Sequence, residues 1–262
     1  MIQGIDISRW QTDINWEKVK GDGIEFVIIR ACNGLTKDKC FEEHMNSAAA
    51  VGIDTGVYCF ARADTVQKAE AEAEFVLSLI KNHRLTYPVC YDMESTELMA
   101  LDNTSRTDVG SAFCEKIENA GYYAMIYTNK DWLENRLEYD RLKRFDIWLA
   151  QWRSSPTWEG TFGIWQLGLG KVDGIGDCDR NVSYRNYPEI IEKAKLNHLD
   201  EKKLAVGDRV RYSGVLFTAS DGEEAAASAD GIFTVREIVE GEKSGVLLEV
   251  SGWASQQDVE IL

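Results

Sequence analysis

Short apolar runs rich in β-branched and aromatic residues alternate with helical stretches over about the first 190 residues. The strand-like runs are IQGIDI (2–7), EFVIIRA (25–31), DTGVYCF (54–60), YPVCYDME (87–94), YYAMIYT (122–128), FDIWLAQW (145–152) and FGIWQL (162–167). Because strands that alternate with helices typically form β/α units, this order predicts a parallel sheet that closes on itself.

The helical links between these runs are clearest early in the chain. Residues 40–51 and 65–82 carry apolar positions at helical spacing, and a further helix is expected at 130–137. In contrast, residues 154–162 and residues 168–177, the second of which are rich in glycine, are predicted to be loops. The fold class expected is therefore α/β, an irregular TIM-like (β/α) barrel with few late helices.

The pattern changes character after a charged helical stretch. From residue 204 onward, short alternating runs are separated by glycine and acidic turns, which is typical of a small all-β domain. We therefore expect a catalytic barrel at 1–192, a linker at 193–203 and an all-β module at 204–262.

Composition excludes several classes of partner. The formal net charge of −15 would repel nucleic acid and anionic membranes, and no apolar run approaches the roughly 18 residues that a membrane span needs. The first residues lack the basic stretch and apolar core of a secretory signal. An uncharged glycan is a more suitable partner than either polyanion.

The cysteines and histidines indicate neither a metal site nor a nucleophile. The six cysteines show no CxxC spacing, so buried free thiols are favoured over disulfides. The three histidines are isolated in the sequence. We expect no metal and no cofactor, although clustered carboxylates leave Mg²⁺ or Ca²⁺ open as an alternative.

Paired carboxylates end the fourth strand-like run. Asp92 and Glu94 are two residues apart, so on a strand both project to the same side, about 6–7 Å apart along the chain. Asp6 near the end of the first run and Asp179 in GDCDRNV would converge on the same barrel mouth, although Asp177 competes with Asp179. Crowded carboxylates raise one another's proton affinity, which suits the general acid of a glycosidase.

Aromatic residues gather near the same strand ends, as in glycan clefts where rings stack on sugar faces. Taken residue by residue, packing in the core is the favoured explanation for each aromatic side chain, and Trp10 and Trp16 are assigned to packing. The candidates for substrate binding are Tyr58, Phe60, Tyr127, Trp148, Trp152 and Gln166.

An ordered set of motifs resembles the Chalaropsis-type lysozymes, glycoside hydrolase family 25. The motifs are GIDIS…Q at the N-terminus, FVIIRA, GVYCF, DME, YTN, WLAQW, WQ, and KVDGI…DRN. The resemblance covers about residues 2–190. It departs from the family pattern at Cys59, where His is common, and in the loop ACNG, where ATEG is usual.

The resemblance implies an N-acetylmuramidase that cleaves the β-1,4 bond between N-acetylmuramic acid and N-acetylglucosamine in peptidoglycan. It implies Glu94 as the general acid, with Asp92, Asp6 and Asp179 as partner carboxylates. Asp179 is preferred over Asp177 because Asn181 follows it at the family spacing. Asp92 is expected to orient the N-acetyl group of the substrate, with direct attack by water left open. The expected place of action is the bacterial cell wall, reached by export or by lysin-type release from the cytoplasm.

The tail resembles the SH3-like modules appended to cell-wall lysins, which implies wall binding through Tyr212, Phe217 and Trp253. A structural cap without affinity is the alternative for this tail. For the whole chain, the alternatives are an inactive glycan-binding protein, a hydrolase of another N-acetylated glycan such as chitin, and a metal-dependent hydrolase.

Overall fold

The chain forms two compact units, Met1–Asp200 and Glu201–Leu262. A computed structural model describes residues 1–199, 209–239, 242–250, 252–255 and 258–261. Within these residues, no helix is both long enough and apolar enough to cross a membrane. Each unit is built around its own hydrophobic core.

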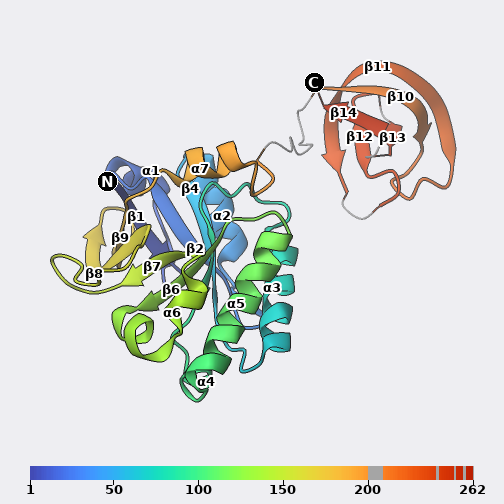
Figure 1. The fold of residues 1–262 in the computed structure, drawn as a ribbon. Coiled ribbons are helices and arrows are strands. Elements are labelled where there is room, and N and C mark those ends of the chain that lie inside the picture. Colours follow the sequence, from blue (N-terminus) through green and yellow to red (C-terminus); the bar gives the residue numbers. More distant parts are fainter. Residues whose placement is uncertain (200–208, 240–241, 251, 256–257, 262) are drawn as a thin grey trace. The chain divides into compact units, whose positions relative to one another are not determined.

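The first unit is a closed barrel of eight strands with a short appended strand, β3 (Thr36–Lys37) (Figure 1). The barrel strands are β1 (Ile2–Ile7), β2 (Phe26–Asn33), β4 (Asp54–Phe60), β5 (Val89–Asp92), β6 (Ala124–Asn129), β7 (Asp146–Ala150), β8 (Ile164–Val172) and β9 (Gly176–Ser183). Pairing between β1 and β2 and between β1 and β9 closes the ring. The expected α/β barrel is confirmed.

The expectation of a parallel sheet is wrong at one strand. β9 runs antiparallel to both of its neighbours, β8 and β1. The loop expected at 168–177 is also wrong, because most of it forms the arms of the β8–β9 hairpin. Glycine there serves a register shift at Gly168 and a tight turn at Gly174 and Gly176, all three with positive φ.

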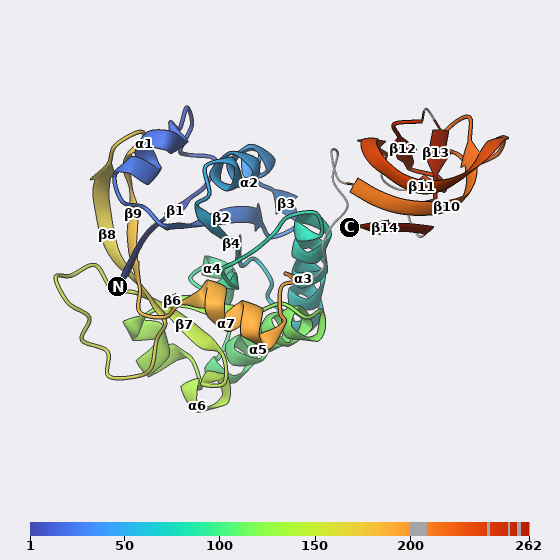
Figure 2. The ribbon, with the colours of Figure 1, turned by 90° about the horizontal axis from the view of Figure 1, so that it is seen from above.

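Most of the helices lie around the outside of the barrel (Figure 2), and they become short after β6, as expected. They are α1 (Trp16–Gly21), α2 (Phe41–Ala50), α3 (Val66–Ile80), α4 (Thr96–Met99), α5 (Asn103–Asn119), the π-helix η1 (Trp132–Arg136), α6 (Tyr139–Leu142) and α7 (Tyr187–Ala194). The π-helix lies within the helix predicted at 130–137. α3 and α5 pack side by side (Figure 1).

Helix α7 closes the amino-terminal end of the barrel (Figure 2). Its buried Tyr187 and Ile191 join the interior cluster that contains Phe26 and Tyr87, which lie at or just before the starts of β2 and β5. The rings of Phe26 and Tyr87 are stacked, with centroids 4.3 Å apart. Side chains therefore fill the barrel interior at this end.

The second unit contains only strands among its described residues. They are β10 (Arg209–Phe217), β11 (Ala225–Ile238), β12 (Val246–Leu248), β13 (Gly252–Ala254) and β14 (Val259–Ile261). The sheet order is β11-β12-β13-β10-β14, and β11 also pairs with β10, so four of the strands close on themselves. Val210, Tyr212 and Leu216 of β10 point into its core.

Candidate active site

A cleft of about 220 Å³ lies at the carboxyl ends of the parallel barrel strands. Barrel enzymes place their chemistry at this end, because the loops that follow each strand converge there. The residues that line the cleft are Asp6, Ile7, Ser8, Trp10, Gln11, Arg30, Tyr58, Phe60, Asp92, Glu94, Tyr127, Trp148, Gln166 and Asp179.

Asp6 and Asp179 face each other across the β1–β9 pair. They are direct partners in the antiparallel register, and such partners have Cβ atoms about 4.5–5.5 Å apart. The reversal of β9 therefore brings Asp179 to the mouth from mid-strand and not from a strand end. Asp177 is exposed and does not line the cleft, so the structure favours Asp179 of the two candidates.

Two buried amides hold the Asp6 carboxylate. Gln166 Nε2 and Asn181 Nδ2 donate to Asp6 Oδ2 at 2.9 and 2.7 Å. Trp148 Nε1 in turn donates to Asn181 Oδ1 at 2.7 Å, and Tyr127 OH donates to Gln166 Oε1 at 3.0 Å. Because these donors are held by packed aromatic residues, the position of Asp6 is fixed before any ligand arrives.

Asp92 and Glu94 flank a buried methionine, Met93, which faces the opposite side. The Met93 N–H donates to the Tyr127 carbonyl, and Thr128 Oγ1 donates to the Met93 carbonyl, both at 2.9 Å. Asp92 is only 5% exposed, and its Oδ1 atom has no hydrogen-bond partner among the described residues, whereas Glu94 is exposed toward the cleft. An unpaired buried acceptor is costly unless a ligand satisfies it.

The four carboxyl groups all bind protons more tightly than usual. Burial, then repulsion from Asp179, raises the pKa of Asp6 to about 7. Burial, then repulsion from Glu94, raises the pKa of Asp92 well above its usual range. Burial also raises the pKa of Glu94, with Asp179 contributing, and the pKa of Asp179. The cleft therefore retains protons near neutral pH, as a general acid requires.

A family model, "Glycosyl hydrolases family 25", matches residues 5–169. The chain belongs to this family. The matched segment starts one residue before Asp6 and includes Asp92 and Glu94, while Asp179 lies beyond it. The chain is therefore a glycoside hydrolase, and its barrel is the family 25 barrel.

Relatives from several organisms support this assignment. Lysozyme M1 of Streptomyces globisporus is 28% identical over 204 residues, which cover 69% of this chain and 67% of that protein. The autolytic lysozyme of Clostridium acetobutylicum is 28% identical over 182 residues, 68% of this chain but 54% of that protein. The crystal structure of the bacterial lysozyme from Streptomyces coelicolor has a TM-score of 0.63 at 28% identity and covers 76% of this chain and 96% of that one.

The family 25 cleft brings together all but one of the residues predicted for the barrel site. The four acids line it, as do Tyr58, Phe60, Tyr127, Trp148 and Gln166. The exception is Trp152, which is 60% exposed beside the cleft and donates from Nε1 to Gln166 Oε1 at 3.0 Å. Trp152 therefore contacts the site through Gln166.

Sequence reasoning did not select several residues of the site. Trp10, which was assigned to packing, is 73% exposed and lines the cleft, whereas Trp16 is buried as expected. Arg30 was not selected because it appears only as a polar residue inside an apolar run, and Asn181 served only to choose between Asp179 and Asp177. Ile7, Ser8 and Gln11 also line the cleft. The position of Trp10 directly after a strand that carries an acid was the available indication.

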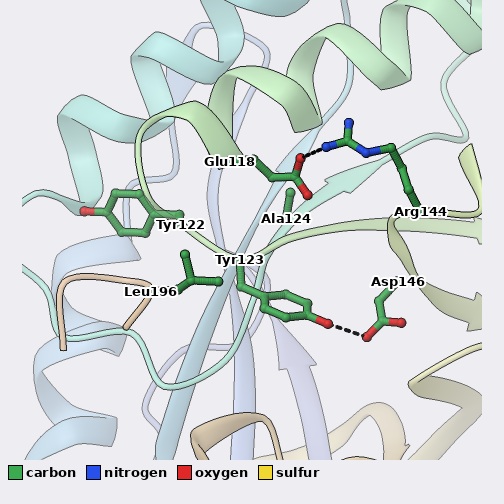
Figure 3. A pocket seen from close by; sticks show the side chains of 7 residues that line it. All are labelled: Glu118, Tyr122, Tyr123, Ala124, Arg144, Asp146 and Leu196. Atoms are coloured by element: carbon green, nitrogen blue, oxygen red, sulfur yellow. Dashed lines mark hydrogen bonds and ion pairs between the residues drawn. The ribbon is translucent and has the colours of Figure 1, made fainter. Parts of the chain in front are cut away.

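A second cavity, of about 270 Å³, lies at the starts of β6 and β7 (Figure 3). Its two carboxylates are engaged: Tyr123 OH donates to Asp146 at 2.8 Å, and Arg144 pairs with Glu118. This cavity thus lacks the unpartnered acids of the first cleft.

Among the described residues, no group of three or more His, Cys, Asp or Glu side chains is arranged to hold a metal ion.

The six cysteines are all buried and unpaired, as predicted. In the second unit, Tyr212 is 2% exposed and its OH donates to the Val215 carbonyl at 2.6 Å, so the structure places this predicted wall-binding residue in the core. Trp253 and Phe217 are half-buried and are direct partners between β13 and β10.

Proposed function

We propose that this family 25 hydrolase is a lysozyme, a 1,4-β-N-acetylmuramidase that cleaves the bond between N-acetylmuramic acid and N-acetylglucosamine in bacterial peptidoglycan. The observation that carries the proposal is the cleft, where four carboxyl groups with raised proton affinity meet beside aromatic rings. Relatives described as lysozymes, and one as an N,O-diacetylmuramidase, support the choice of substrate.

Glu94 is the general acid in this proposal. Its side chain is the one of the Asp92–Glu94 pair that opens into the cleft, where it can reach the leaving oxygen. Burial and the neighbouring Asp179 raise its pKa, so Glu94 binds its proton more tightly than a free glutamic acid does. Glycoside hydrolysis needs such a neutral acid because an alkoxide is a poor leaving group. The acid protonates the glycosidic oxygen as its bond to the anomeric carbon breaks.

Asp92 orients the N-acetyl group of the substrate. Its Oδ1 atom is a buried acceptor without a partner, which suits an incoming amide N–H. An acetamido group held in this way can attack the anomeric carbon through its carbonyl oxygen. The charges of Asp6 and Asp179 act on the electrostatic environment of the Asp92–Glu94 pair. The half-buried ring of Phe60 and the exposed ring of Trp10 provide faces for sugar rings, whereas Trp148 is only 1% exposed and supports Asn181 from the interior.

The decisive experiment measures the release of reducing ends from purified peptidoglycan by the wild type and by Glu94→Gln. We expect muropeptides that end in reducing N-acetylmuramic acid from the wild type, and a loss of about 10³-fold or more in the variant. Asp177→Asn is the matched control, since this acid lies two residues from Asp179 but outside the cleft.

Other outcomes would select other functions. Wall binding without reducing ends from either protein would point to an inactive glycan-binding protein. Activity on chitin that exceeds activity on peptidoglycan would point to a hydrolase of another N-acetylated glycan.

We further propose that the second unit is an SH3-like module that binds the bacterial cell wall and raises the local enzyme concentration there. Trp253 and Phe217, half-buried partners on adjacent strands, are the contact residues, and the buried Tyr212 is not. Sedimentation with wall sacculi tests this in the full chain carrying Glu94→Gln. Adding Trp253→Ala should release the protein from the walls. Unchanged co-sedimentation would indicate that the second unit is a structural cap without affinity for the wall.

A further inference from the structure

Arg30 of β2 is the only positively charged side chain among the described residues that line the cleft. Its Nε donates to Asp38 Oδ2 at 2.7 Å, and the two side chains are only 9% and 1% exposed. A buried pair of this kind is held rigidly, since loss of either partner would leave a buried charge unpaired.

Asp38 lies between β3 and α2, does not line the cleft, and accepts three hydrogen bonds. Besides Arg30, the backbone N–H groups of Arg9 and Cys40 donate to it at 3.1 and 3.0 Å. One carboxylate thus joins β2, the loop after β1 and the start of α2. The loop after β1 carries Trp10, whose ring lies 4.9 Å from the Arg9 guanidinium carbon at the mouth of the cleft.

The positive charge of Arg30 favours the ionised form of Asp92, whereas the neighbouring acids disfavour it. The titratable or charged groups that interact electrostatically with Asp92 are Asp6 of β1, Arg30 of β2, Tyr58 and Cys59 of β4, Cys90 of β5, Glu94 after β5 and Tyr127 of β6, with Asp38 behind Arg30. Burial raises the pKa of Asp92, as do Glu94 and Asp6, and Arg30 is the group that lowers it. Without this cation, Asp92 would bind its proton more tightly still.

We propose that Asp38 is a positioning residue of the active site, which holds Arg30 against the cleft, where its positive charge favours the ionised form of Asp92. The inference rests on the proposed glycosidase function and extends the working site to a carboxylate that touches no substrate. An ionised Asp92 is a stronger acceptor for an amide N–H of the substrate than a protonated one.

Charge alone and positioning predict opposite results for the loss of Asp38. Removal of its negative charge, with Arg30 still in place, would favour ionisation of Asp92 and move the acid limb of the kcat/KM profile to lower pH. Loss of the Arg30 position would have the reverse effect, because Asp92 would lose its only cation. The direction of the limb therefore separates the two explanations.

The test measures kcat/KM for peptidoglycan against pH in Arg30→Gln, Arg30→Lys, Asp38→Ala and Asp38→Asn. We expect Arg30→Gln to raise the acid limb by about 1 pH unit, and Arg30→Lys to bring it back toward the wild type. Asp38→Ala should raise the limb as well and lower kcat/KM by about 10- to 100-fold. Asp38→Asn keeps the side-chain volume and replaces the alanine variant if that one does not fold.

Asp146→Asn is the matched control. Asp146 also accepts three hydrogen bonds, from Tyr123, Tyr187 and Arg185, but it lies at the amino-terminal end of the barrel. We expect this variant to keep the acid limb of the wild type whatever its effect on thermal stability.

Two results would overturn the inference while the proposed function stands. One is an acid limb of the kcat/KM profile that stays at the wild-type pH in Arg30→Gln, and the other is an acid limb that moves to lower pH in the Asp38 variants. A wild type without activity on peptidoglycan would instead overturn the proposed function.

Discussion

Replacement of Asp6 by Asn should stabilise the barrel at high pH while it removes activity. Asp6 is 8% exposed and accepts both of its hydrogen bonds through Oδ2. An asparagine oxygen at that place can still accept from Gln166 and Asn181, so the network survives without the charge. The wild type, in contrast, must ionise a buried carboxyl group beside Asp179 as the pH rises.

The magnitude follows from the pKa of Asp6, which burial and Asp179 raise from 3.8 to about 7. At about 1.4 kcal/mol per pH unit, this rise corresponds to about 4 kcal/mol. The folded state binds the extra proton, so the contribution is fully present below about pH 4 and is lost as the pH rises to about 7. The variant escapes this loss because asparagine does not titrate.

Urea unfolding of the wild type and Asp6→Asn at pH 5 and pH 8 measures the effect. Tryptophan fluorescence reports mainly the barrel, since seven of the eight tryptophans lie in the first unit. The stability advantage of the variant should widen by about 3 kcal/mol between the two pH values. An advantage that stays constant would show that Asp6 ionises in the folded protein as easily as in the unfolded chain, which would refute the proposed electrostatics of the cleft.

Three further predictions concern the scaffold and the cleft. Gly56→Ala should lower the free energy of unfolding by about 1–3 kcal/mol in urea titrations, because its Cβ would lie 2.7 Å from Tyr87 Cβ and 2.9 Å from the Pro88 carbonyl. Trp10→Ala should raise KM for glycan strands several-fold with little change in kcat, since the ring is exposed at the mouth. Dialysis against a chelator should leave the rate of reducing-end release unchanged, and a loss that Mg²⁺ restores would favour metal-dependent hydrolysis.

The parts of the site that could be predicted from the sequence are those fixed by strand periodicity. Residues two apart on a strand project to the same side. This periodicity places Asp92 and Glu94 on one side and Met93 on the other. The ends of parallel strands converge at one mouth of a barrel, which brings Asp6 into the same cleft. Both inferences need only local geometry and closure of the sheet.

Other features depend on contacts that no local pattern reports. Helix α5 was not predicted because its buried face includes Arg106, Thr107 and Gly110, which are polar or small residues and give no apolar periodicity. Arg106 is buried because its guanidinium donates to backbone carbonyls such as that of Leu98 at 2.8 Å. Hydrophobic periodicity cannot detect a helix face whose polar groups are satisfied in this way.

The direction of β9 is the clearest case of a feature that tertiary structure decides. A parallel strand would have brought only its last residues to the mouth of the barrel. The antiparallel β9 instead starts at the mouth, so its first half lies beside the end of β1. Asp179 then faces Asp6, while Asn181, two residues farther, donates to the same carboxylate from inside the barrel. One reversed strand therefore supplies both the repulsion that raises the pKa of Asp6 and the hydrogen bond that opposes it. Because these effects come from neighbouring positions of one strand, a change in the register of β9 would alter both at once, and the spacing of Asp179 and Asn181 is as much a part of the site as the acids themselves.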